Sequence, residues 1–251
     1  MKNNFKLLLL ILSMSIIILS NGCKTDKDNE PGPVELEFIN AVGNVGLLYN
    51  QNYLSESGQV FSVSKFKYYI SNIKLTKDDG TVYAPESYYL IDQDVPASKK
   101  ITLENVPAGT YKGVSFTIGI DSARNCSGAQ TGALDPLYGM FWDWNTGYIF
   151  FKLEGHSDAA PGTGDNLIFH TGGYKLPHNC IRTVSPSLGG QTFTVKSGHT
   201  PNVHYKTDIL EVFKSPTVID FTSTYSVQGG PQAEIISDNY TDMITLDHIH
   251  P

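Results

Sequence analysis

Alternation of apolar and polar residues is the feature that most constrains the fold of this 251-residue chain. In residues 34–38, 66–70 and 114–120, apolar side chains occupy every second position. Successive side chains of a β-strand point to opposite faces, so this pattern predicts strands with one buried and one hydrated face. Helical spacing is found in residues 209–213 and 233–240. We therefore expect an all-β protein, an antiparallel β-sandwich with one or two short helices near its C-terminal end.

The first 22 residues are expected to be a lipoprotein signal peptide. Lys2 and Lys6 precede an apolar run over residues 7–19, which is shorter than the roughly 20 residues of a membrane-spanning helix. The run leads into Gly22-Cys23, an order that resembles the site at which bacterial lipoproteins are cleaved and acylated. Acylation of Cys23 would anchor the protein, because each buried methylene contributes about 0.8 kcal/mol. The alternative is an ordinary signal peptide with an incidental cysteine.

Composition divides the remaining chain into a tether and one domain. Residues 23–33 are polar, charged and interrupted by proline, so they are expected to form a flexible tether. Residues 34–251 have the length of a single domain, and a chain with 40% hydrophobic residues can build a sizeable core. The acidic residues after Cys23 resemble a surface-export signal, but a solvated linker explains them equally well. We expect an outer-membrane lipoprotein whose domain faces either the periplasm or the cell exterior.

Charge and missing motifs exclude several classes of function. The formal charge is −7 for the whole chain and −9 without residues 1–22, which contain two lysines and no acidic residue. An acidic protein is not expected to bind nucleic acid or to contact a membrane except through its lipid anchor. The sequence also lacks a serine nucleophile elbow and a paired-histidine protease helix. We therefore expect a binding protein and not an enzyme.

Cys126 and Cys180 are the cysteines that remain beyond Cys23. Both stand in turn-rich, polar stretches, and an even pair in an oxidising compartment is usually bridged. The sequence therefore predicts a Cys126–Cys180 disulfide. The alternative is that Cys180, two residues after His178, donates a thiolate to a metal.

Four histidines are candidate metal ligands. On a strand, His248 and His250 would present their imidazoles on one face with Cα atoms about 7 Å apart, a spacing that allows chelation. Neutral imidazole suits copper, zinc and nickel, and copper usually has the highest affinity among them. His170 and His204 each stand in a short apolar run. The alternatives are a frayed terminus for the pair and ordinary buried histidines for the other two.

Five segments together resemble one family of proteins. They are residues 63–72, 119–122, 132–136, 139–148 and 169–173. The fourth segment contains both tryptophans, Trp142 and Trp144, and the fifth contains His170 in the order Phe-His-Thr-Gly-Gly. Between residues 38 and 250 the chain resembles the MbnP-like copper-binding proteins, which are related to the CorA and MopE copper proteins.

The resemblance implies a copper site built from histidine nitrogens. His170 corresponds best, because its sequence context is intact, and His204, His248 and His250 are further candidates. The family also implies an oxidised tryptophan, kynurenine, as an additional copper ligand, made by a di-haem partner enzyme of the cytochrome c peroxidase type. Trp142 and Trp144 are both candidates for that oxidation.

A lipid-anchored, extracytoplasmic copper-binding protein for copper acquisition, storage or delivery is therefore the function we expect. The alternative is a non-catalytic β-sandwich module that binds a glycan or a protein partner, with its 14 tyrosines and two tryptophans as stacking surfaces. The orientation of the two tryptophans distinguishes these functions. They would face an open surface in a glycan-binding module and would face His170 in a copper site.

Overall fold

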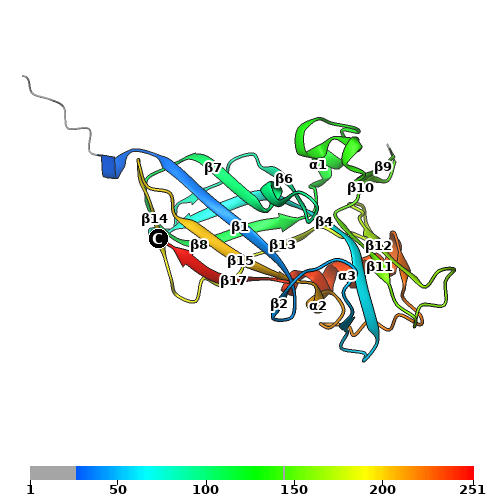
Figure 1. The fold of residues 1–251 in the computed structure, drawn as a ribbon. Helices are drawn as coiled ribbons and strands as arrows, with labels where there is room; N and C mark the ends of the chain where they lie inside the picture. Colours follow the sequence, from blue (N-terminus) through cyan, green and yellow to red (C-terminus); the bar gives the residue numbers. More distant parts are fainter. Residues whose placement is uncertain (1–26, 144) are drawn as a thin grey trace, which may run out of the picture.

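The computed structural model describes residues 27–143 and 145–251 (Figure 1). The strands are β1 (Gly32–Val42), β2 (Val45–Gly46), β3 (Tyr53–Leu54), β4 (Val60–Lys77), β5 (Val82–Tyr83), β6 (Tyr88–Asp92), β7 (Lys100–Val106), β8 (Gly109–Ile118), β9 (Phe141–Asp143), β10 (Gly147–Tyr148), β11 (Phe151–His156), β12 (Asn166–Thr171), β13 (Arg182–Val184), β14 (Phe193–Val195), β15 (Asn202–Asp208), β16 (Ser226–Val227) and β17 (Ile244–His250). The α-helices are α1 (Ser122–Asn125), α2 (Ile209–Val212) and α3 (Gly230–Asn239). Short 3-10 turns are η1 (Lys27–Asn29), η2 (Pro96–Lys99), η3 (Gly132–Leu134), η4 (Pro136–Tyr138) and η5 (Tyr240–Asp242).

Two large sheets form the fold. The first is five-stranded, with β17, β15, β1 and β2 in order and β7 paired with β1. The second runs from β13 through β8, β4, β11 and β12 to β16, and the 18-residue strand β4 also pairs with the short strands β3, β5 and β6. A separate hairpin joins β9 to β10. The described residues thus form the all-β sandwich that the alternating pattern predicts.

Aromatic side chains fill the space between the two sheets. Phe38 of β1 stacks on Tyr205 of β15, with ring centroids 5.4 Å apart. From the second sheet, Phe116 of β8 meets both rings edge-on, at 5.6 Å and 5.8 Å between centroids. These residues are fully buried, and edge-to-face pairs at this spacing stabilise a core beyond the burial of their area. The alternating strand residues therefore face each other across the sandwich.

Both regions of helical spacing form helices. Residues 209–212 make α2, and α3 begins at Gly230. Pro231 lies in the first turn of α3, where backbone N–H groups make no hydrogen bond within the helix, so the N–H that proline lacks costs nothing there. Helix α3 packs against α2 and β12. Its buried residues include Ala233 and Ile236, as the spacing predicts.

Most strand pairs are antiparallel, as expected, but two pairs are parallel, and the tether boundary is shifted. Strands β1 and β15 pair in parallel, as do β12 and β16, because long connections return each later strand in the same direction as its partner. The predicted tether, residues 23–33, ends early, since β1 already begins at Gly32. A Cβ at Gly32 would lie 2.3 Å from the carbonyl oxygen of Lys196, so glycine is required for this close packing.

The predicted Cys126–Cys180 disulfide is wrong, because both cysteines are free. Cys126 is exposed at the end of α1, and its thiol donates a hydrogen bond to the Ser122 carbonyl oxygen at 2.7 Å. Cys180 is completely buried, and burial raises the pKa of its thiol to about 11. A thiol that stays protonated is a poor metal donor, so the thiolate alternative for Cys180 also lacks support. An even cysteine count does not place the two side chains together.

No helix within residues 27–143 and 145–251 has both the length and the apolar composition needed to cross a bilayer. Cys23, the predicted acylation site, lies outside the described residues.

Candidate metal site

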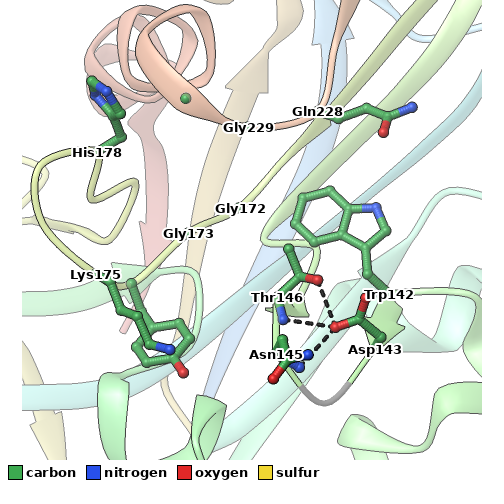
Figure 2. Close-up of a pocket in the computed structure, with 12 residues that line it drawn as sticks. Trp142, Asp143, Asn145, Thr146, Gly172, Gly173, Lys175, His178, Gln228 and Gly229 are labelled. Carbon is green, nitrogen blue, oxygen red and sulfur yellow. Dashed lines mark hydrogen bonds between the residues drawn. The ribbon is translucent and has the colours of Figure 1, made fainter.

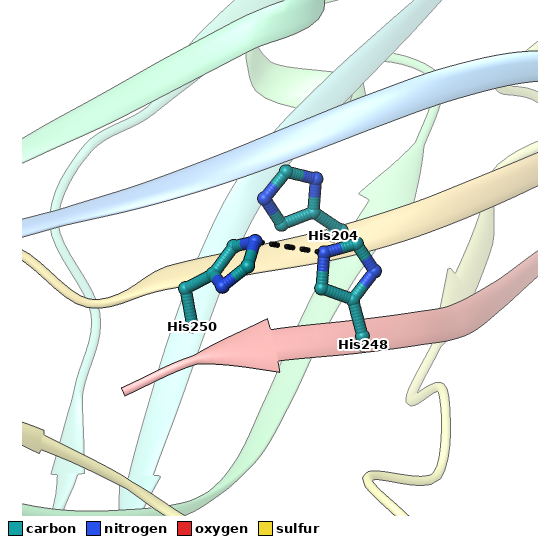
Figure 3. A group of neighbouring side chains, drawn as sticks. All are labelled: His204, His248 and His250. Carbon is teal, nitrogen blue, oxygen red and sulfur yellow. Dashed lines mark hydrogen bonds between the residues drawn. The ribbon is translucent and has the colours of Figure 1, made fainter.

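Strands β15 and β17 bring His204, His248 and His250 together on one face of the five-stranded sheet (Figure 3). The strands pair antiparallel, and their register sets His204 opposite His248 and Asn202 opposite His250. Residues two positions apart on a strand share a face, so His248 and His250 lie on the same side as expected. The neighbours of His204, Val203 and Tyr205, are fully buried, which puts the three imidazoles on the outer face of the sandwich.

The three rings are in close contact. The imidazoles of His204 and His248 stack with centroids 4.2 Å apart and an interplanar angle of 13°. The ring of His250 meets both edge-on, at 5.0 Å from His204 and 4.6 Å from His248. One potential ligand atom of each residue lies within 4.8 Å of the other two. Because metal–imidazole bonds are about 2.0–2.1 Å long, small side-chain adjustments would let all three bind one ion.

Asp247 orients the ring of His248. Its Oδ2 lies 2.8 Å from Nδ1 of His248, and a carboxylate can only accept a hydrogen bond, so Nδ1 carries the hydrogen. In the neutral ring this leaves a lone pair on Nε2, which lies 3.0 Å from Nε2 of His250. A carboxylate behind a histidine is the usual arrangement around a metal ligand.

His204 has two buried ring nitrogens with no partner in the described part of the chain. Its side chain is 12% exposed, and neither Nδ1 nor Nε2 makes a hydrogen bond to any residue of 27–143 or 145–251. A buried polar group without a partner costs about 1–3 kcal/mol, and a bound ion is one common way to satisfy such a group. Burial and the nearby ring of His248 lower the pKa of His204, so its ring stays neutral and keeps a lone pair for a metal.

Oxygen donors from β1 and β15 border the histidine cluster. Strand register sets Glu37 beside His204, and the Glu37 carboxylate lies 3.8 Å from Nδ1 of that ring. The Asn202 amide nitrogen lies 3.4 Å from the same carboxylate, while its Oδ1 is buried without a partner among the described residues. Three imidazoles with nearby oxygen atoms fit copper(II) or zinc and disfavour calcium or magnesium, which prefer oxygen ligands throughout.

The site predicted from the sequence did not include Asp247, Glu37 or Asn202. Asp247 was detectable from its position next to His248, since metal-binding histidines commonly contact a carboxylate. Glu37 and Asn202 were not detectable, because the parallel pairing of β1 with β15 joins segments far apart in the chain.

His170 lies apart from this cluster. It stands on β12 in the second sheet, where its Nε2 is 2.8 Å from Oε1 of Glu154. Lys152 faces it on the paired strand. Burial and the charge of Lys152 together lower the pKa of His170. In the part of the chain that the structure describes, His170 belongs to no cluster of metal-binding side chains.

Trp142 also lies away from the three histidines, because β9 and the end of β17 are at opposite ends of the molecule in Figure 1. Its ring lies against Gly172, where a Cβ would be 2.8 Å from the indole Cζ3. Trp142 lines an open pocket that includes Lys175, His178 and Gln228 but not His170 (Figure 2). Trp144, the other candidate for oxidation, lies outside the described residues.

Comparisons with known proteins are consistent with this fold. A sequence model described as MbnP matches residues 31–231, which leaves His248 and His250 beyond the matched range. The solved structure of MbnP from Methylosinus trichosporium is similar with a TM-score of 0.54 and 15% sequence identity, covering 81% of this chain and 86% of that chain. At this identity the likeness concerns the fold. No curated protein matches the chain. Because the family match covers most of the sequence, this protein belongs to the MbnP family.

Proposed function

We propose that this MbnP-family protein binds copper through His204, His248 and His250. Two facts support the proposal most strongly. Three imidazoles lie within reach of one ion, and both ring nitrogens of His204 are buried without a partner among the described residues. Copper(II) generally has the highest affinity of the divalent first-row ions for nitrogen and oxygen donors. A bound cation would supply the partner that the buried nitrogens lack.

The position of the three histidines at the edge of a sheet supports a role in carrying copper and not in catalysis at a copper ion. Strand β17 is at the edge of its sheet, and His250 is exposed next to the C-terminal residue. His204 is the buried ligand, so an incoming carrier would meet His250 first and could exchange the ion through that side. We infer a role in copper acquisition, storage or delivery.

Export and anchoring complete the proposal. Acylation of Cys23 would hold the domain at the outer membrane, facing the periplasm or the outside. Substitution of Cys23→Ser should release the protein from the membrane fraction. Failure of labelled palmitate to enter the unsubstituted protein would contradict the anchor and leave the copper site untouched.

The proposed copper site uses histidine nitrogens without a tryptophan product. Oxidation of Trp142 or Trp144 by a di-haem partner stays a separate expectation, because Trp142 lines a different part of the surface. Mass analysis of the peptide that contains residues 140–152, taken from native-source protein, tests it. Two unmodified tryptophans in copper-loaded protein would contradict that oxidation.

Equilibrium dialysis against copper(II) tests the histidine site. The unsubstituted protein should bind one ion per chain, and replacement of His204, His248 and His250 by alanine together should abolish that binding. His170→Ala and the loop variant His199→Ala should retain it. Equal stoichiometry and affinity in the triple variant and the unsubstituted protein would overturn the proposal.

A further inference from the structure

The pocket beside Trp142 is a second candidate binding site, separate from the histidine cluster. It has a volume of about 430 Å³ and is formed by the β9–β10 hairpin, the loop after β12 and the start of α3. Volumes of roughly 300–1,000 Å³ are typical of small-molecule sites. Figure 2 shows Trp142 and Thr146 on one side of the opening and Lys175 and His178 on the other.

Hydrogen bonds to the Asp143 carboxylate and a close contact with Gly172 hold the β9–β10 side of this pocket, where Trp142 lies. Oδ1 of Asp143 accepts hydrogen bonds from the backbone nitrogens of Asn145 and Thr146 at 2.7 Å and 2.8 Å, and from the Thr146 hydroxyl at 2.6 Å. The indole of Trp142 rests where a side chain at Gly172 would collide with it. These contacts order Trp142, Asp143 and Thr146 before a ligand arrives, which lowers the entropy cost of binding.

Polar side chains with unused hydrogen-bonding capacity surround the indole. The side-chain amides of Asn145 and Gln228 are exposed and have no hydrogen-bond partner among the described residues. Each amide offers both donors and an acceptor, so it can bind two adjacent hydroxyl groups. Lys175 adds a cation whose Nζ lies 5.0 Å from the ring centroid of Tyr174. The lining therefore combines flat aromatic surface with groups that bind hydroxyls.

The charges of the lining disfavour an ionic ligand. Asp143 offsets the charge of Lys175, and Nδ1 of His178 lies 3.1 Å from the carboxylate of Glu234. With one carboxylate and one ammonium group in the lining, the pocket has no excess charge of either sign that would select an anionic or a cationic ligand. A neutral ligand with an apolar face and several hydroxyls matches these features best. Its C–H groups can rest on the negative face of an aromatic ring.

We propose that this pocket binds a neutral hexose unit of an oligosaccharide, with Trp142 as the stacking surface and Asn145 and Gln228 as hydroxyl partners. This site goes beyond the proposed copper function and does not depend on it. It would allow a lipid-anchored protein to hold a neighbouring glycan while the histidine cluster faces another direction.

Calorimetric titration of the full chain with maltotriose, cellotriose, laminaritriose and mannotriose tests the proposal. At least one trisaccharide should bind saturably, with an affinity in the millimolar range or tighter. Trp142→Ala should weaken that binding by about tenfold or more, which is a loss of about 1.4 kcal/mol. Asn145→Ala and Gln228→Ala change exposed residues and should each weaken it several-fold without altering the fold.

Two matched controls show whether a bound sugar occupies this pocket or another part of the surface. Tyr138 is an exposed aromatic residue outside the pocket, so Tyr138→Ala should bind as the unsubstituted protein does. The triple histidine variant should also bind normally, whether or not copper binding fails. Absence of saturable binding for all four sugars would overturn the proposal. Equal binding by the unsubstituted protein and the Trp142, Asn145 and Gln228 variants would overturn it too.

Discussion

His204 and His248 stack ring on ring across two neighbouring strands, with centroids 4.2 Å apart. Two protonated imidazoles at this distance would repel each other, whereas neutral rings can pack closely. Burial, followed by the charge that the neighbouring ring can carry, lowers the pKa of His204 and so favours the neutral form of that ring. Neutral imidazole is also the form that binds a metal.

Acid should destabilise the metal-free protein. Burial lowers the pKa of both His170 and His204 in the folded state, while the unfolded chain titrates near the ordinary value of 6.5. Below that pH the unfolded state binds more protons than the folded state, so the free energy of unfolding falls as the pH falls. The stabilisation is complete above the unfolded pKa and is lost as the pH drops through the folded pKa.

Urea unfolding across this pH range, with chelator present, measures the effect. His170→Gln and His204→Gln should each reduce the dependence of stability on pH. An identical dependence in both variants and the unsubstituted protein would contradict the assigned pKa shifts.

Asp247→Asn should weaken copper binding by roughly ten- to a hundredfold, the usual effect of removing a carboxylate behind a histidine ligand. The amide can no longer attract the hydrogen on Nδ1 of His248 as a carboxylate does, so the ring loses its fixed orientation. Competition with a chromophoric copper chelator measures the affinity. Asp242→Asn, an exposed change in η5 just before β17, is the control, and equal loss in both variants would argue against an orienting role.

The side chain of alanine does not fit at Gly172. Its Cβ would lie 2.4 Å from the backbone oxygen of Tyr148 and 2.8 Å from the indole of Trp142. Gly172→Ala should lower the free energy of unfolding by about 1–3 kcal/mol, as overpacking typically does. The matched change Gly46→Ala meets open space and should have little effect in the same denaturant titration. Equal stability of both variants would contradict the prediction and show that Trp142 and the Tyr148 backbone move readily to accept the added Cβ.

The two domain cysteines should differ sharply in reactivity. Cys126 is exposed, whereas Cys180 is buried with a thiol pKa raised to about 11, so maleimide should label Cys126 alone in the native state. Peptide mass analysis of a Cys23→Ser protein counts the labels at each position. Both cysteines should react after unfolding without a reductant. A Cys126–Cys180 peptide that appears only before reduction would contradict the free thiols.

Local pattern was sufficient to predict several elements. Apolar alternation at Val34, Leu36 and Phe38 corresponds to β1, because one face of this strand packs in the core. The apolar spacing after Pro231 corresponds to α3. Parallel pairing of β1 with β15 was not predictable, since alternation identifies a strand and carries no information about its partner.

The candidate site was predictable only in part for the same reason. His248 and His250 lie two residues apart on one strand, so the sequence alone could predict that their imidazoles share a face. His204 reaches them through the register of β15 against β17, which depends on the whole sandwich. The apolar run before His170 belongs to β12, but no strand was predicted there, and β12 lies in the second sheet, where the imidazole contacts Glu154.

Electron paramagnetic resonance of the protein loaded with one equivalent of copper(II) shows which side chains bind the ion. Coupling of the electron to imidazole nitrogens reports the number and identity of the ligands, independently of the affinity. We expect nitrogen couplings that diminish when His204, His248 or His250 is replaced singly by alanine and stay unchanged in His170→Ala. An unchanged spectrum in all three single variants, or a spectrum altered only by His170→Ala, would contradict this expectation.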